Sequence, residues 1–197
     1  MLMSVKSVVP SVIAFAIFQV LLTTAEAQSR NALPERFTAA AVSTGGPRSS
    51  SVATQVEIRI DRWSTAEEAQ RLTTVLKNKG PEALLETLRD LKPVGSINTP
   101  GNLAYDLHYA YQEDTGDGRR IFLATDRPIT YWQAVNRPRI VNYPFTFIEL
   151  RMNGKGEGEG KLALATQINV TDDGKAIELV SYRTQPIDLN EVKRQDD

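Results

Sequence analysis

The feature that most constrains the fold of this chain is a period of two in the apolar residues between Arg119 and Tyr182. A strand is expected over Arg119–Thr125, followed by a crossing with three prolines (Asp126–Pro144) and three more strands joined by two glycine-marked turns. Alternation of this kind places one set of side chains on a covered face of a sheet. Strands that follow one another through short turns pair antiparallel. This part of the chain therefore predicts an antiparallel sheet.

Two more strands are expected before this region. Residues Val52–Asp61 alternate β-branched and polar side chains, which is typical of a strand covered on one face. Residues Asn102–Gln112 also alternate, with a mostly aromatic inner face. That face comprises Leu103, Tyr105, Leu107, Tyr109 and Tyr111. At the other end of the chain, residues 186–192 are expected to extend the sheet as an edge strand.

Helical sequence lies between the first two of these strands. Ser64 and Glu67 have the spacing of a capping box, which predicts a helix beginning there. Gly80 and Pro81 then separate two segments with leucines at helical spacing, and Pro93 ends the second. We therefore expect a bent pair of amphipathic helices that covers the sheet.

Together these elements predict an α+β fold. We expect a curved antiparallel sheet of about six or seven strands with an N-terminal helix pair packed on one face, in the order strand, helix, helix, strands. This order is similar to that of helix-grip proteins, in which a curved sheet wraps a cavity. Helix-grip proteins also have a long C-terminal helix, which this sequence lacks. A half-barrel, or a flat sheet covered on one face, is therefore an open alternative.

Residues 1–27 have the organisation of a secretory signal peptide. An apolar run over residues 8–22 is followed by small residues and a cleavage site between Ala27 and Gln28. The run is shorter than the roughly 20 residues that span a bilayer, and Pro10 interrupts it. We predict a secreted or periplasmic protein with no stable membrane span after cleavage. An uncleaved N-terminal anchor is the alternative.

The remaining chain is expected to form one domain. Residues 28–51 are rich in small and polar residues, so they predict a flexible leader. Residues 52–192 are expected to form a single α+β domain, and residues 193–197 a polar tail. A chain of this length can bury a core of its own.

Composition narrows the possible chemistry. The chain has no cysteine, which excludes disulfides, thiolate metal sites and cysteine nucleophiles. With 23 basic and 24 acidic residues, it gives no reason to expect a nucleic acid partner. His108 is the single histidine and is expected at the surface; the alternative is a functional pair with Asp106. No metal or other cofactor is therefore expected.

Two sequence segments, FLATDRPITYWQ and FIELRMN, lie between Ile121 and Lys161. In this region the chain resembles secreted bacterial proteins of an uncharacterised family. The resemblance implies export and a single compact domain, and it implies no activity. The glycine-rich run Gly154–Lys161 matches neither a phosphate loop nor a dinucleotide fingerprint, so we expect a solvated hairpin turn there.

Aromatic and cationic side chains form the candidate binding site. Tyr131, Trp132 and Arg137 lie in the proline-containing crossing, and Tyr105 and Tyr109 lie on the aromatic strand. Rings and nearby cations bind apolar or sugar-like ligands by stacking and cation–π contacts. The alternative is that these rings pack in the core and at corners of the fold.

Three functions are consistent with these features. The leading hypothesis is an exported, non-enzymatic module that binds a small apolar ligand or a protein partner, because no catalytic constellation is evident. The second is a cell-envelope interaction protein that pairs through the edge strand at residues 186–192. The third is a hydrolase or isomerase that uses carboxylates such as Asp106 or Glu149.

Overall fold

A computed structural model of the chain describes residues 33–43, 52–99, 103–127, 129, 145–165 and 186–195. It also describes the backbone of three short strands, β1 (Ala14–Ala16), β10 (Gln167–Val170) and β11 (Ala176–Val180), which form a small antiparallel sheet. The strand β10 lies against the helix α1 (Ala66–Asp90).

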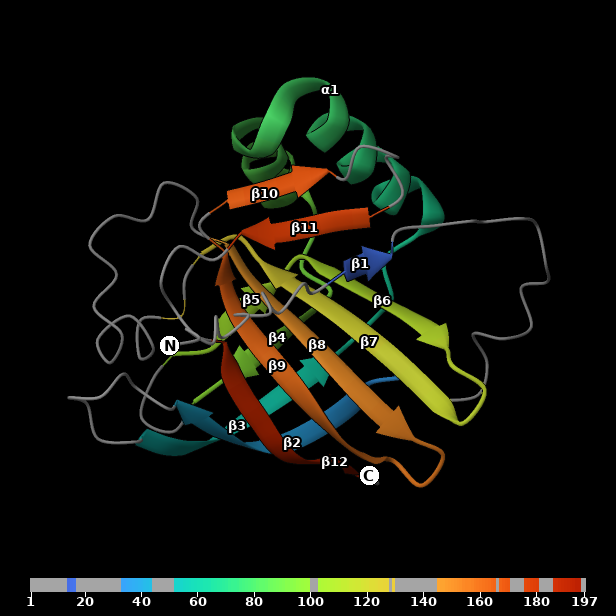
Figure 1. The fold of residues 1–197 in the computed structure, drawn as a ribbon, viewed down its shortest axis with the longest axis vertical. Coiled ribbons are helices and arrows are strands. Elements are labelled where there is room, and N and C mark those ends of the chain that lie inside the picture. Colours follow the sequence, from blue (N-terminus) through green and yellow to red (C-terminus); the bar gives the residue numbers. More distant parts are fainter. Residues whose placement is uncertain are drawn as a thin grey trace, which may run out of the picture.

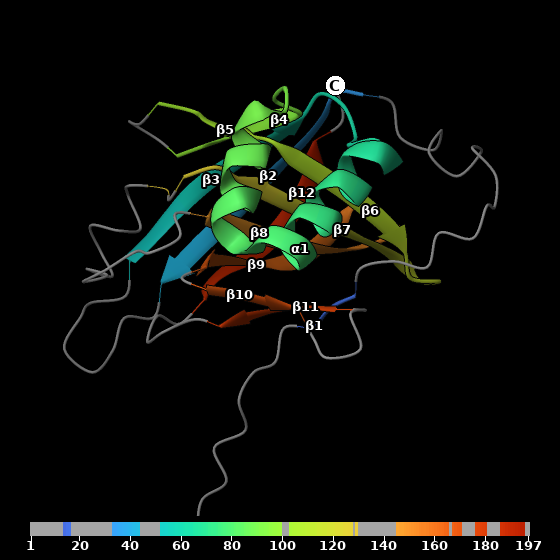
Figure 2. The ribbon, with the colours of Figure 1, turned by 90° about the horizontal axis from the view of Figure 1, so that it is seen from above.

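Nine antiparallel strands form the main sheet, in the spatial order β5-β4-β3-β2-β12-β9-β8-β7-β6 (Figure 1). The strands are β2 (Glu35–Ser43), β3 (Val52–Ile60), β4 (Gly95–Asn98), β5 (Tyr105–Leu107), β6 (Tyr109–Asp114), β7 (Gly118–Thr125), β8 (Phe145–Asn153), β9 (Glu157–Ala165) and β12 (Ile187–Gln195). The helix α1 lies across the outside of this sheet (Figure 2).

A bend at His108 nearly closes the sheet into a barrel. The strand β5 pairs with β4 before the bend, whereas β6 pairs with β7 directly after it. The two ends of the sheet are therefore consecutive parts of one chain segment, and β5 also contacts β7. At the bend itself, the backbone N–H of His108 donates to the carbonyl of Ala124 on β7 at 2.9 Å. The predicted single strand over Asn102–Gln112 is thus divided between the two ends of the sheet.

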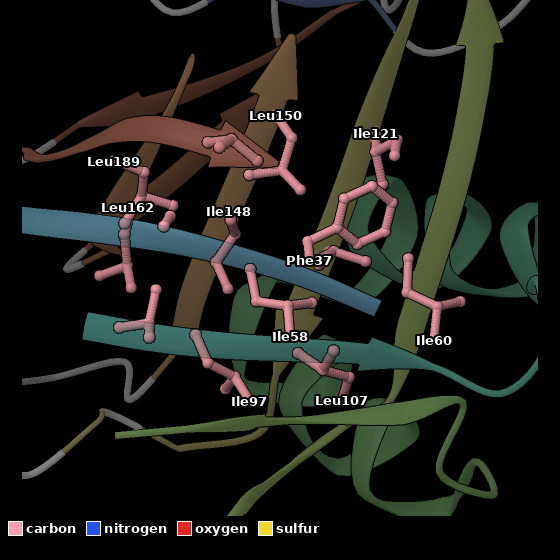
Figure 3. Packing of buried hydrophobic residues seen from close by; sticks show 14 of the residues in the cluster. Phe37, Ile58, Ile60, Ile97, Leu107, Ile121, Ile148, Leu150, Leu162 and Leu189 are labelled. Atoms are coloured by element: carbon pink, nitrogen blue, oxygen red, sulfur yellow. The ribbon is translucent and has the colours of Figure 1, made fainter. Parts of the chain in front are cut away.

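Large apolar side chains, most of them aliphatic, fill the inside of the barrel. They project inward from opposite walls and meet along its middle (Figure 3). The alternation of each strand produces this arrangement, because every second side chain faces inward. The largest fully buried members include Phe37, Ile58, Ile60, Ile97, Leu107, Ile121, Leu123, Ile148 and Leu150. The inside of the barrel is therefore a packed core.

A buried ion pair closes one end of the barrel. Glu35 of β2 and Arg119 of β7 both lie among inward-facing residues, and their side chains form two hydrogen bonds, one of them 3.1 Å between Nη1 and Oε1. Arg119 also donates to Gln112 Oε1 at 2.8 Å, and its guanidinium lies 5.8 Å from the centre of the Phe37 ring. A bidentate pair with further contacts satisfies both buried charges. It also joins β2 to β7, which are not neighbours in the sheet.

The residues that follow β7 close the opposite end of the barrel. After β7, the carbonyl of Arg127 accepts hydrogen bonds from the hydroxyls of Thr125 on β7 and Thr146 on β8. Two residues further on, Ile129 is fully buried and belongs to the barrel core. The first residues of the predicted crossing therefore cover this end of the barrel.

The helix α1 begins and bends close to the predicted residues. Thr65 and Glu68 form the capping box, one residue later than expected, while Ser64 instead bonds to the backbone of Ala110 on β6. Gly80 has a φ of 82°, in the left-handed region, and the next residue is a proline without an N–H. The structure therefore contains one kinked helix where a helix pair is predicted.

The predicted α+β fold class is wrong. The structure is mostly antiparallel sheet, with nine strands in a nearly closed barrel rather than six or seven in a sheet with a helix pair on one face. The bend at His108 is the main physical reason, because it lets one predicted strand supply both ends of the sheet.

The prediction of a flexible leader over residues 28–51 is wrong for Glu35–Ser43, because these residues form β2 in the middle of the sheet. The domain therefore includes β2 and does not begin at residue 52. The prediction of a polar tail is likewise wrong for residues 193–195, which belong to β12. Alanines occur on both faces of β2, so its alternation is weak in the sequence although Phe37 is fully buried. Pairing with β3 and β12 makes this a strand.

Candidate functional site

A second apolar cluster lies between α1 and the outer face of the sheet. It is separate from the barrel core, because its sheet residues alternate with those that point inward. Leucines of the helix pack here against outward-facing residues of β7 and β8. The buried members are Leu72, Leu76, Leu84, Leu88, Leu91, Ala124 and Phe145.

This interface contains a partly open hollow of about 50 Å³, which we name the helix pocket. Its floor comes from β6, β7 and β8, and its roof comes from α1 on both sides of the kink. The floor residues are Tyr109, Ala124, Phe145 and Phe147, and the roof residues are Ala69, Leu72, Thr73, Leu76, Leu84 and Leu88. Small side chains at Ala69 and Ala124 leave space that larger residues would occupy.

Aromatic rings make up most of the pocket floor. The rings of Phe145 and Phe147 are stacked with their centres 5.8 Å apart. Tyr109 stacks on Tyr111 at 6.5 Å, and Tyr111 in turn stacks on Phe122 at 6.5 Å. Stacked neighbours restrict the movement of each ring, so the floor is a preformed apolar surface.

The described lining of the helix pocket contains no charged side chain. Its polar groups are two hydroxyls. The hydroxyl of Thr73 donates to the carbonyl of Ala69 at 2.9 Å, within the helix. Burial raises the pKa of Tyr109, and the neighbouring Tyr111 adds to this effect. The phenol of Tyr109 is therefore neutral under ordinary conditions.

A polar cluster beside the pocket fastens the C-terminal end of α1 to the sheet. The Nδ1 of His108 lies 3.0 Å from the carbonyl of Leu91, and this nitrogen carries the proton because a carbonyl only accepts. The Nε2 of His108 lies 3.7 Å from the carboxylate of Asp126. Asp126 is also 3.5 Å from the Nε of Arg89 on α1 and 3.0 Å from the Nε of Arg127.

The expectation of a surface histidine is wrong, because His108 is buried at the bend of the sheet. Its charged neighbour is Asp126, whereas Asp106 is exposed. A regular strand would have kept His108 and Asp106 on one face. The bend instead turns the histidine toward the end of β7.

The structure separates the predicted ligand residues. Tyr109 lines the helix pocket, but Tyr105 packs against the barrel core. The bend at His108 again explains the difference, since the faces of the strand exchange there. Tyr131, Trp132 and Arg137 lie outside the described residues, so their proposed role stays a prediction.

The hydrolase or isomerase hypothesis names Glu149, and the cell-envelope hypothesis depends on an edge strand at residues 186–192. Glu149 is buried, with its carboxylate 2.8 Å from the Nε of Arg151 and 3.9 Å from that of Arg120, so it is held in ion pairs. The strand β12 pairs with β2 on one side and β9 on the other. Residues 187–192 are therefore internal to the sheet, and the expectation of an edge strand is wrong.

The sequence left open whether a hollow lies between the helices and the sheet, although it carries a signal for a covered outer face. Residues Ile121–Ala124 of β7 are consecutive and apolar, and β8 carries Phe145, Phe147 and Ile148. Strands that are apolar on both faces are covered on both faces. Here the core covers one face and α1 covers the other.

Among the described residues, no group of three or more histidine or acidic side chains is arranged to hold a metal ion. The helix in that part of the chain is not long and apolar enough to cross a membrane.

Comparisons with family models, curated proteins and solved structures find no match for this chain. The resemblances to an uncharacterised secreted family and to the helix-grip order therefore stay predictions.

Proposed function

We propose that the protein is an exported, non-enzymatic module that binds a small apolar ligand in the helix pocket. The observation that carries this proposal is the contrast between a filled barrel and a hollow, uncharged interface beside it. Ligand sites are concave and mostly apolar, and they commonly lie between packed elements of a fold. The export part of the proposal depends on the signal peptide predicted over residues 1–27.

The lining of the pocket favours an apolar occupant over water. Water needs two to four polar partners to stay in a cavity, whereas an apolar cavity of about 150 Å³ stays dry and binds small rings. The helix pocket, at about 50 Å³, reaches such a size only if its roof moves. The described lining offers one hydroxyl that is not engaged within the helix, that of Tyr109. A small ring that stacks on Phe145 and Phe147 would bury apolar surface on both partners.

The kink in α1 supports entry of a ligand. Leu72 and Leu76 contribute to the roof before Gly80, and Leu84 and Leu88 contribute to it after Gly80. A glycine in the left-handed region is a point where the backbone can change its dihedral angles at low cost. Rotation there would separate the two halves of the roof without breaking any strand pairing.

The proposal is tested by filling the pocket from the helix side. In the Ala69→Leu variant a larger side chain occupies the hollow, so we expect toluene to bind at least tenfold more weakly than to the unmodified protein. The measurement is the change in amide chemical shifts of α1 and β6–β8 during titration with toluene.

The matched control is Ala66→Leu, the same substitution at an exposed position of the same helix. This variant should bind toluene as the unmodified protein does. Absence of saturable binding to the unmodified protein, or equal binding by the Ala69→Leu variant, would contradict the proposal.

Export is tested separately by N-terminal sequencing of the protein recovered outside the cytoplasm. We expect the mature chain to begin at Gln28. A chain that still begins at Met1 would contradict cleavage.

A further inference from the structure

The hydroxyl of Tyr109 is the polar group on the floor of the helix pocket. The side chain lies on β6, on the outer face of the sheet, and lines the hollow together with Ala124 and Phe145. Among the described residues, none forms a hydrogen bond with this hydroxyl in the structure, and Tyr109 itself is half-buried. The other hydroxyl of the lining, that of Thr73, is already bonded to Ala69.

The charges around the pocket favour a neutral ligand. The described lining has no cation that could compensate a buried anion. On α1, Arg89 faces Asp126 at 3.5 Å and Arg71 faces Asp90 at 3.9 Å, so these two cations already have carboxylate partners. Burying an ion without a partner is strongly unfavourable. Burial also raises the pKa of Tyr109, so its phenol remains a neutral donor and acceptor.

We propose that the helix pocket selects a neutral ring-containing molecule with one hydrogen-bonding group, and that the Tyr109 hydroxyl recognises this group. The ring stacks against Phe145 and Phe147, while the polar group meets the tyrosine. This inference rests on the proposed function and adds the class of ligand to it. A purely apolar ring would cover the hydroxyl of the half-buried Tyr109 and leave it without a partner, which a polar ligand avoids.

Three probes with the same ring separate the contributions: toluene, benzyl alcohol and benzoate. Each is titrated into the full mature chain and into the Tyr109→Phe variant, which keeps the ring and removes the hydroxyl. Tyr111→Phe is the control, because Tyr111 lies on the same face of β6 and stacks on Tyr109 but does not line the pocket. Amide chemical shifts report both the affinity and the location of binding.

We expect Tyr109→Phe to weaken benzyl alcohol binding about three- to tenfold, the range of a single neutral hydrogen bond. Toluene binding should change by less than about twofold, which also shows that the variant pocket is folded. Tyr111→Phe should leave both affinities unchanged. Benzoate should bind the unmodified protein at least about tenfold more weakly than benzyl alcohol, because its charge is desolvated without a partner.

Equal effects of Tyr109→Phe on toluene and benzyl alcohol, or no effect on either, would overturn the inference and leave the proposed function standing. Tight binding of benzoate would overturn the selection for neutral ligands. If neither neutral probe binds the unmodified protein, the inference and the proposed function both fail.

Discussion

The barrel interior and the helix–sheet interface are both apolar, but they are built differently. Inside the barrel, side chains from strands such as β3 and β8 interlock, the Glu35–Arg119 pair closes one end, and Ile129 covers the other. At the interface, leucines of α1 rest on aromatic rings and leave the helix pocket open. Polar contacts hold this layer mainly at its ends, through Arg62 and Glu68 at one end and Asp126 at the other.

The difference follows from how each region is connected. Neighbouring strands are joined by backbone hydrogen bonds along their length, which fixes the inward side chains at close spacing. The helix satisfies its own backbone bonds and meets the sheet through side chains alone. It can therefore stand slightly away from the sheet without leaving backbone groups unpaired. Packing imperfections collect in this layer, and the helix pocket is one of them.

The largest expected effect is at the buried ion pair. Glu35→Gln leaves the Arg119 guanidinium without its carboxylate inside the barrel, so we expect the free energy of unfolding to fall by about 4–5 kcal/mol. Urea denaturation followed by circular dichroism measures this change. The control is Glu57→Gln, on an exposed position of β3, which should change stability by less than about 0.5 kcal/mol. Similar losses in the two variants would mean that the pair does not stabilise the barrel.

The next effect compares the same truncation in the two regions. Leu150→Ala in the barrel core should cost about 4 kcal/mol, because enclosed neighbours cannot collapse into the cavity. Leu76→Ala at the interface should cost about 2 kcal/mol, since this side chain already borders the helix pocket.

Leu76→Ala also enlarges the pocket, so we expect it to bind toluene more tightly than the unmodified protein. Urea denaturation and toluene titration measure the two results. Equal losses of stability at Leu150 and Leu76 would remove the distinction between a filled core and a loosely packed layer.

A smaller effect is expected where the helix is fastened to the sheet. Asp126→Asn weakens the contacts with Arg89 and His108, so stability should fall by about 1–2 kcal/mol. Hydrogen exchange should become faster in residues 81–90 of α1 and stay slow in β7 and β8. The control is Asp90→Asn, whose contact with Arg71 is exposed and should contribute less than about 0.5 kcal/mol. Faster exchange throughout the barrel would show that Asp126 supports both regions equally.

The smallest effect lies at the start of the helix and depends on pH. Hydrogen bonds from Arg62 lower the pKa of Glu68 from its ordinary value of 4.5. A lowered pKa means that the ionised carboxylate stabilises the folded state above about pH 4.5, and that this contribution is lost as the pH falls through the folded value.

Glu68→Gln should therefore cost about 1 kcal/mol at pH 7, since glutamine still fits the capping box but loses the charge. The difference from the unmodified protein should shrink as the pH falls through the lowered pKa of Glu68. Thermal melts at a series of pH values measure it, with the exposed Glu67→Gln as control. A difference that stays constant with pH would exclude the ion pair as its source.

Several elements of the fold follow from the sequence because their signals are local. The strands around Ile58, Ile121 and Ile148 are confirmed where alternation predicts them. The kink at Gly80 and the helix beginning near Thr65 depend on neighbouring residues only, so they also lie close to their predicted places. In the candidate site, Tyr109 is the predicted residue that the pocket contains.

Other features depend on residues far apart in the chain. The strand β2 has too few large residues for a clear pattern, and its pairing with β3 and β12 decides its conformation. Likewise, the burial of His108 results from contacts with Leu91 and Asp126. No local pattern specifies such contacts.

By itself, the sequence determined an antiparallel set of strands with alternating faces and a helical segment that kinks at Gly80 and Pro81. Only the tertiary structure decided that a bend at His108 closes the strands into a barrel, which face of β6 covers the core, and that a hollow remains beneath α1. The physical reason is that a period of two records that side chains alternate, but it does not record which side becomes the interior. That choice is made when distant strands pair and enclose one face.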